Sequence, residues 1–293
     1  MIIKKIGAKA VKDSRGEKTI QVLVKTSKGK FVTSAPAGKS KGKFEVRSYV
    51  GSLNGDIVVI NHLDISKINS LRLRKFEDLK KVEKIIGKRL GANSLFTLEA
   101  SLLKAMASEN NQELWRFLNP RKINFKIRSV GNAIGGGLHS KGVNGKRPDF
   151  QEFLFIANGN DFSECVKINY LAYYLTRKYL GFWSKRNDEG AWETDETNEG
   201  VLMIMKKVKE VVKEKYRLDV DIGLDIGSSS FYKNKEYVYK NPFRKLNKSR
   251  QVDYVVKLIK KYDLFYVEDA LDENDFSGFV EVNCYAGSQC LIV

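Results

Sequence analysis

Two short apolar runs that each end in a carboxylate constrain the fold of this chain most strongly. The run at 218–232, LDVDIGLDIGSSSFY, changes from branched apolar to small residues at Asp225, and LFYVED repeats the pattern at 264–269. A buried parallel strand reads as such a run, and α/β enzymes place chemistry at its carboxyl end. Either acid alone could be a helix cap or a loop residue. Because helix-patterned segments precede both runs, we expect the two carboxylates on the same face of one parallel sheet.

The first 125 residues read as strands followed by helices. Residues 2–35 alternate and turn like a β-meander, and the helix patterns FEDLKKVEKIIGKRL, SLFTLEASLLKAMASE and NQELWRFL come later. Between them lies PAGKSKGKF at 36–44, a glycine-rich basic loop that is either a mobile lid or a connector. This order predicts an α+β domain at residues 1–125.

Residues 126–293 are organised differently. A polar loop leads into the apolar run FLFIA, after which helix patterns alternate with further apolar runs up to Val293. This alternation predicts a parallel α/β domain at 126–293 with right-handed crossovers. A closed eight-stranded α/β barrel takes about 250 residues, more than this segment holds. Since a bare parallel edge strand promotes aggregation, we expect an incomplete barrel that is cut at its end or completed by another chain.

The chain is strongly basic, with a formal net charge of +17. Its lysines and arginines are spread over helix-patterned segments beside acidic residues, as on solvated helix faces, so a dedicated nucleic-acid partner is disfavoured. Attraction of a small phosphorylated substrate is the better use of such a field. No apolar run reaches the roughly 20 residues that a membrane span needs, and no signal peptide is visible. We therefore expect a cytoplasmic protein with no membrane partner.

Several common chemistries are excluded by their missing motifs. The GGG at 135–137 is not a dinucleotide fingerprint, no phosphate-binding P-loop is present, and the acids at 188–199 lack calcium-loop spacing. His139 lies in a glycine-rich loop, where a mobile catalytic or substrate-contacting residue would be placed. The remaining candidates are carboxylates expected at strand ends, namely Glu152, Glu189, Asp225 and Glu268. That inventory suits Mg²⁺ and acid–base work on a carbon acid.

A series of motifs resembles the enolase family in order over nearly the whole chain. AKAVKDSRGEKTIQVLV is similar to its opening strand, SAPAGKSKGKFE to its lid motif and KRLGANSLFTLEASL to its LGANA helix. GGGLHSKG with DFQEFLFI resembles its histidine loop and QEF strand. NDEG, IGLDIGSSSFY and YVEDALDENDFSGF resemble its GDEGG, LD...SEF and EDP...DW motifs. The implied fold is an α+β N-terminal domain followed by an incomplete enolase-type, TIM-like α/β barrel.

The resemblance also implies a metal site and a reaction. Asp225 and Glu268 would be two of three carboxylates on one Mg²⁺, and Ser40 would help to hold a second ion. The implied reaction is the reversible dehydration of 2-phosphoglycerate to phosphoenolpyruvate. Two ions would stabilise the dianion formed when the proton beside the substrate carboxylate leaves.

The remaining site residues take roles in substrate binding and proton transfer by the same resemblance. Glu189 would be the acid that assists departure of the substrate hydroxyl, with Glu152 as its neighbour. His139 and Gln151 would contact 2-phosphoglycerate when the lids close, beside Glu152 and Glu268. The family also suggests a homo-oligomer, unless a complementing C-terminal polypeptide is the partner.

The chain departs from the family pattern at several positions. The family's third magnesium carboxylate, its lysine base, a second histidine and a substrate-binding lysine would all follow Val293. The lid motif carries Lys39 and Lys41, and Asn187 and Ala191 replace glycines around DEG. Two further changes are Ser230 for glutamate in SEF and Ala270 for proline in EDP. Two hypotheses follow: an enolase whose remaining barrel strands come from elsewhere, and a catalytically inactive enolase-like binding protein.

Overall fold

The computed structural model describes residues 1–293 except 36–37, 39–41, 120, 122–126 and 182–183. Its contacts divide the chain into two compact units, Met1–Asn124 and Phe125–Val293. Each unit has its own apolar core. Among the described residues, no helix combines the length and the apolar character that crossing a membrane requires.

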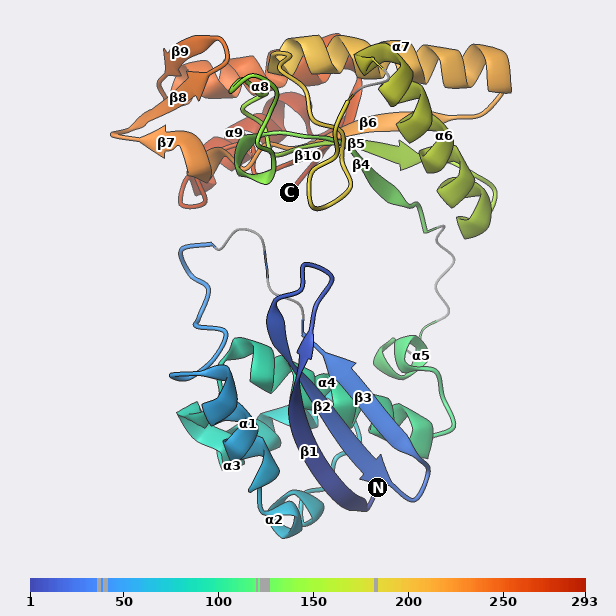
Figure 1. Ribbon diagram of the computed structural model, residues 1–293, viewed down its shortest axis with the longest axis vertical. Coiled ribbons are helices and arrows are strands. Elements are labelled where there is room, and N and C mark those ends of the chain that lie inside the picture. Colours follow the sequence, from blue (N-terminus) through green and yellow to red (C-terminus); the bar gives the residue numbers. More distant parts are fainter. Residues whose placement is uncertain (36–37, 39–41, 120, 122–126, 182–183) are drawn as a thin grey trace. The chain divides into compact units, whose positions relative to one another are not determined.

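The first unit is a three-stranded antiparallel sheet with helices packed on it (Figure 1). Its strands are β1 (Ile3–Lys12), β2 (Lys18–Thr26) and β3 (Lys30–Ser34). Its helices are α1 (Leu53–Asn61), α2 (Ile65–Asn69), α3 (Leu79–Ile86), α4 (Ala92–Glu109) and α5 (Leu114–Leu118), with short 3₁₀ turns η1 (Phe76–Asp78) and η2 (Gly87–Arg89). The alternating residues Ile20, Val22 and Val24 of β2 are buried beneath α4, which explains the period-two pattern in the sequence. This is the predicted α+β arrangement.

The second unit is built on a five-stranded sheet in the order β11-β10-β6-β5-β4. Its strands are β4 (Val130–Gly135), β5 (Glu152–Ala157), β6 (Val220–Asp225), β10 (Leu264–Glu268) and β11 (Leu291–Ile292). Over the described residues the sheet is open, with β4 at one edge and β11 at the other. The helices α6 (Phe162–Leu180), α7 (Asn198–Tyr216), α8 (Lys248–Tyr262) and α9 (Phe276–Ala286) follow one another along its outside (Figure 1).

The expectation of an all-parallel sheet is wrong for the first two strands. β6, β10 and β11 are parallel, but β5 runs antiparallel to β6, and β4 antiparallel to β5. The connections explain both directions. A loop without a crossover helix joins β4 to β5, while two successive helices, α6 and α7, separate β5 from β6. A single helix after β5 would return the chain to the end of the sheet at which β5 begins, and the next strand would be parallel to β5. The second helix brings the chain back to the end at which β5 finishes, so β6 starts there and runs antiparallel to β5.

A small antiparallel sheet extends from the loop after β6. It contains β7 (Tyr232–Lys233), β8 (Glu236–Lys240) and β9 (Phe243–Leu246), and a 3₁₀ turn, η4 (Ser228–Phe231), leads into it. Tyr237 and Tyr239 of β8 are fully buried against the main core, so the alternating residues of this strand face outward. A further 3₁₀ turn, η3 (Gly137–His139), begins the loop between β4 and β5.

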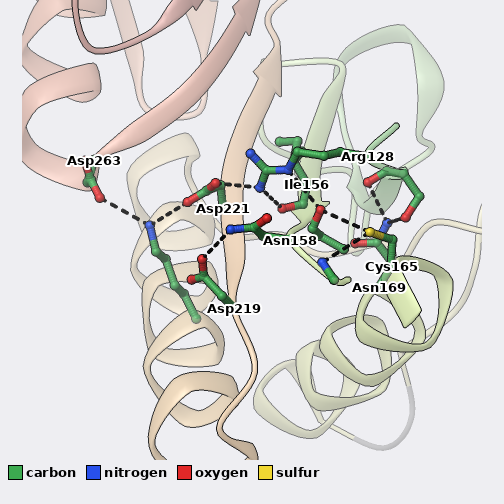
Figure 2. Close-up of polar contacts among 12 residues, drawn as sticks. Arg128, Ile156, Asn158, Cys165, Asn169, Asp219, Asp221 and Asp263 are labelled. Atoms are coloured by element: carbon green, nitrogen blue, oxygen red, sulfur yellow. Dashed lines mark hydrogen bonds and ion pairs between the residues drawn. The ribbon is translucent and has the colours of Figure 1, made fainter. Parts of the chain in front are cut away.

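A network of charged side chains holds the edge of the sheet at which β6 begins (Figure 2). Arg128 Nη2 donates to Asp221 Oδ2 at 2.6 Å, and the same guanidinium donates to the carbonyls of Ile156 and Ala157 at the end of β5. Lys209 of α7 lies 3.3 Å from Asp221 Oδ1 and 3.2 Å from Asp263 Oδ2. These bonds tie β5, β6 and α7 together at this edge.

Candidate active site

Three carboxylates lie in register at the other ends of three neighbouring strands. We call this group, Glu152, Asp225 and Glu268, the carboxylate edge. Glu152, the first residue of β5, pairs with Asp225, the last residue of β6, and Asp225 pairs with Glu268, the last residue of β10. Directly opposed residues project their side chains to the same face of a sheet. The antiparallel direction of β5 is what brings Glu152, at the start of its strand, to the edge where β6 and β10 end.

The ionisation of Asp225 is disfavoured in this arrangement. Burial raises its pKa to about 7, and the neighbouring charges of Glu268 and Glu152 act in the same direction. Its Oδ1 atom is buried and has no hydrogen-bond partner among the described residues. Buried polar atoms are nearly always paired, so an orphaned carboxylate oxygen beside two further carboxylates indicates a missing positive group. The all-oxygen donor set fits a hard divalent cation such as Mg²⁺.

Glu268 is oriented by a neighbour on its own strand. Tyr266 Oη donates to Glu268 Oε2 at 2.5 Å. Burial is the main cause that raises the pKa of the Tyr266 phenol, and the bond to Glu268 adds to it, so the hydroxyl stays protonated and remains a donor. Tyr266 was not predicted as a site residue, although its i, i+2 spacing from Glu268 places both side chains on one face of the strand.

His139 joins the carboxylate edge to a separate loop. Its Nδ1 atom lies 3.2 Å from Glu152 Oε1 and 3.2 Å from Glu189 Oε2, and the ring is buried. The hydrogen bond to Glu152 is the main cause that raises the pKa of the imidazole. The ligand atoms of these three residues all lie within 4.8 Å of one another, a spacing that could also hold a metal ion. The other ring nitrogen, Nε2, has no partner in the described part of the chain.

The prediction that Glu189 lies at a strand end is wrong. It lies in a turn of the long segment between α6 and α7. Asn187 builds this turn, since its Oδ1 accepts from the backbone N–H groups of Glu189 at 3.0 Å and Ala191 at 2.9 Å. Its Nδ2 donates to the His139 carbonyl at 2.8 Å. Asn187, which sequence reasoning treated only as a departure from glycine, therefore fixes Glu189 against His139.

The two other predicted site residues have different outcomes. Gln151 is buried next to the carboxylate edge, and its backbone N–H donates to the Asp225 carbonyl at 3.1 Å. Its side chain packs on Gly227, where an added Cβ would come within 2.2 Å of Gln151 Cδ. Gly227 also has a φ of 59°, so both space and conformation require glycine there. Ser40 lies outside the described residues.

The histidine loop is anchored by buried polar residues that the sequence did not indicate. Glu193 accepts from Ser140 Oγ at 3.0 Å and from the Lys141 N–H at 2.9 Å. At the other end of the loop, Asn198 Oδ1 accepts from the backbone N–H groups of Asp149 and Phe150. These contacts give the loop a defined shape around His139.

Comparison with known proteins identifies the family. Residues 128–293 match the model described as enolase, C-terminal TIM barrel domain, and residues 3–118 match enolase, N-terminal domain. The chain belongs to the enolase family. The predicted resemblance is therefore confirmed, as is the fold of an enolase N-terminal domain followed by part of the enolase barrel domain.

Archaeal enolases are among the relatives that match. The chain is 32% identical to the enolase of Methanosphaera stadtmanae over 99% of its own length and 73% of the relative's. It is 30% identical to that of Methanothermobacter thermautotrophicus, again over 99% and 73%. The enolase of Picrophilus torridus matches at 32% over 70% of this chain and 50% of the relative. The enolase family uses Mg²⁺, which agrees with the oxygen-rich edge at Asp225.

Proposed function

We propose that this chain provides part of an enolase site that interconverts 2-phosphoglycerate and phosphoenolpyruvate. The observation that carries the proposal is the in-register carboxylate edge at Glu152, Asp225 and Glu268, with the orphaned Asp225 Oδ1 at its centre. Asp225 and Glu268 would hold Mg²⁺, with Ser40 contributing to a second ion. When bound, the ions supply positive charge beside the substrate carboxylate.

The residues around His139 support the roles in proton transfer and substrate binding. Glu189 and Glu152 approach the same imidazole nitrogen of the buried His139, so this cluster can hold a proton and supply it to a departing hydroxyl. Glu189 is the acid in this proposal and Glu152 its neighbour. His139 and Gln151 contact the substrate, with Glu152 and Glu268 beside it. The two proposed Mg²⁺ ligands, Asp225 and Glu268, thus come from strands, whereas the acid Glu189 comes from the segment between α6 and α7.

By the family resemblance, the base belongs to the part of the enolase barrel that these 293 residues do not cover, since they span 73% of the archaeal enolases of Methanosphaera stadtmanae and Methanothermobacter thermautotrophicus. In the family the lysine base and the third magnesium carboxylate follow the strand that ends here at Val293. We therefore expect negligible turnover from the 293-residue chain alone. Co-expression with a polypeptide that supplies the C-terminal barrel strands of an archaeal enolase should give measurable turnover of 2-phosphoglycerate.

Two variants make this experiment specific. Glu189→Gln in the co-expressed pair should lower turnover by about 100-fold or more, because a positioned acid contributes that much. Asp253→Asn, the matched loss of one carboxylate from an exposed position on α8, should leave turnover unchanged. Turnover by the purified chain alone would contradict the dependence on a second polypeptide.

The inactive binding protein is the second candidate, and the replacements at Ser230 and Ala270 favour it. Ala270 follows Glu268 by two residues, and its carbonyl accepts from Ser228 Oγ at 2.8 Å, so this backbone is held without proline. If the co-expressed pair binds 2-phosphoglycerate but does not turn it over, this candidate replaces the enzyme.

A further inference from the structure

A cavity outside the carboxylate edge is lined by an unusual number of cations. It has a volume of about 320 Å³ and lies between the histidine loop, residues 137–149, and the β7–β8 hairpin. Four basic side chains line it: Lys146 and Arg147 from the loop, and Lys233 and Lys240 from the hairpin. This volume is at the lower end of the range for small-molecule sites.

Both walls of the cavity are shaped by tight two-residue turns. On the loop side, Asn144 and Gly145 have positive φ values of 50° and 76°, and Val143 and Lys146 exchange both backbone hydrogen bonds at 2.9 Å. Asparagine followed by glycine is the preferred sequence for such a type I′ turn. On the hairpin side, Asn234 and Lys235 also have positive φ values. The two segments that carry the cations are therefore regular turns with fixed geometry.

Hydrogen bonds lock one wall against the other. The Asp149 carboxylate accepts from the backbone N–H groups of Lys240 at 2.7 Å and Asn241 at 3.1 Å. Asn241 Nδ2 in turn donates to the Arg147 carbonyl at 3.2 Å. The backbone segments that carry the two pairs of cations are thus held at a fixed spacing before any ligand binds, which lowers the entropic cost of binding.

The acidic groups near the cavity are already engaged. Asp149 is buried, and both of its oxygens accept from backbone N–H groups. Glu236, which shares the outward face of β8 with Lys240, lies 3.6 Å from Lys245. Within the described residues, the side chains of Lys146, Arg147 and Lys233 form no ion pair, and Lys146 and Lys233 are exposed. The cavity therefore holds an excess of positive charge.

We propose that this cavity binds a small molecule that carries a chain of two or more phosphate groups. Four cations facing one carboxylate leave an excess of charge that a single phosphate does not balance, whereas a di- or triphosphate does. The cavity is also lined by Phe231 and Val238, which give one side an apolar surface for the organic part of such a molecule. Nothing in the proposed dehydration uses these cations, so the site is additional to it.

Calorimetric titration of the full chain with inorganic triphosphate and with ATP tests the proposal. The buffer contains a chelator and no Mg²⁺, so that the metal site plays no part. Saturable binding of one equivalent is expected, with inorganic phosphate at least about tenfold weaker, because a single phosphate makes fewer charge-assisted contacts. Equal affinity for phosphate and triphosphate would overturn the proposal.

Matched variants distinguish this cavity from the general basic charge of the chain. The double variants Lys146→Gln/Arg147→Gln and Lys233→Gln/Lys240→Gln should each weaken triphosphate binding at least tenfold. Lys206→Gln/Lys213→Gln removes the same charge from exposed positions on α7 and should change affinity less than twofold. Circular dichroism confirms that each variant is folded. Equal weakening by the α7 pair would overturn the site.

Two further measurements separate this result from the proposed function. Asp225→Asn should bind triphosphate as the wild type does, because Asp225 does not line the cavity. An excess of 2-phosphoglycerate should not displace triphosphate. Displacement would assign the cavity to the substrate site and overturn the claim of a separate site, whereas loss of dehydration activity alone leaves the binding result intact.

Discussion

Glu152 and Asp225 lie directly opposite each other on β5 and β6, two strands that run in opposite directions. One acid begins its strand and the other ends its strand, so the antiparallel pair places both at one edge. Glu268 joins them through the parallel pair β6 and β10. The site therefore depends on a mixed sheet, and a change of strand direction would separate these carboxylates by the length of a strand.

Tyr266 should act as a positioning residue for the metal site. Tyr266→Phe removes the donor to Glu268 Oε2 and leaves the ring in place. Loss of such an outer-shell hydrogen bond typically weakens metal affinity about 10- to 100-fold. Calorimetric titration with Mg²⁺ measures the effect, and Tyr285→Phe at an exposed position on α9 is the control. Unchanged Mg²⁺ affinity in Tyr266→Phe would show that Glu268 needs no such support.

The carboxyl group of Asp225 should make the metal-free protein less stable as the pH rises. Its pKa is about 7 in the folded chain, against an ordinary value of 3.8, because of burial and the charges of Glu268 and Glu152. A raised pKa gives a contribution to stability that is present below about pH 4 and is lost as the pH rises through about 7, with a slope of up to about 1.4 kcal/mol per pH unit.

Denaturant unfolding of the chelated protein across this pH range tests that contribution. Asp225→Asn should show a flatter profile than the wild type, because the amide does not ionise. Subtracting the profile of Asp225→Asn from that of the wild type removes the contribution of other groups. One such group is Glu99, because burial raises its pKa to about 7. Parallel profiles would mean that Asp225 ionises in the folded chain without cost.

The titration of His139 should report on its two carboxylate partners. The chain contains two histidines, so proton NMR resolves the His139 ring with one other signal to assign. Its pKa should lie above 6.5, and Glu152→Gln should lower it more than Glu189→Gln does, because the hydrogen bond to Glu152 is the largest cause of the shift. The reverse order would contradict the geometry of the cluster.

Asn187→Ala should release the Glu189 turn from His139. The variant loses the two bonds from Asn187 Oδ1 to the turn and the bond from Nδ2 to the His139 carbonyl. The pKa of His139 should then fall toward the value that it has in the Glu189→Gln variant. The same NMR titration measures this change. Asn160→Ala, an exposed change outside this turn, is the control. A His139 titration identical to that of the wild type would show that Glu189 is held by other contacts.

The ion-pair network at the opposite edge should contribute to stability without affecting the site. Asp221→Asn weakens the bond from Arg128, whose guanidinium is about one-fifth exposed, and the contact with Lys209. The expected loss in the free energy of unfolding is about 1–3 kcal/mol. Asp253→Asn on exposed α8 is the matched control and should cost less than about 0.5 kcal/mol. If Asp221→Asn lowers the free energy of unfolding no more than Asp253→Asn does, the network does not contribute to stability.

The carboxylate edge was largely predictable because its pattern is local. An apolar run that ends in acid places Asp225 and Glu268 at strand ends whatever the surrounding topology. The direction of β5 was not predictable, since the alternation of apolar residues is the same in either direction. The prediction that Glu189 lies at a strand end was wrong, because the Asn187 side chain accepts from two N–H groups of a local turn and donates to the distant His139 carbonyl, and neither contact leaves a periodic pattern.

The cationic cavity was not predictable for a related reason. In the sequence, Lys146 and Arg147 lie in the histidine loop, and Lys233 and Lys240 belong to the general excess of basic residues. Hydrogen bonds from backbone N–H groups at the end of β8 to Asp149, and from Asn241 to the Arg147 carbonyl, hold the two pairs at one cavity. Such long-range polar contacts leave no periodic signal in the sequence.

We expect the edge formed by Glu152, Asp225 and Glu268 to bind Mg²⁺. Calorimetric titration of Mg²⁺ into the purified chain, beside Asp225→Asn and Asp253→Asn, tests it most directly. We expect one saturable ion in the wild type and in Asp253→Asn, and an affinity at least about tenfold weaker in Asp225→Asn, because a carboxylate ligand is lost. Equal Mg²⁺ affinity in Asp225→Asn and the wild type would contradict the claim.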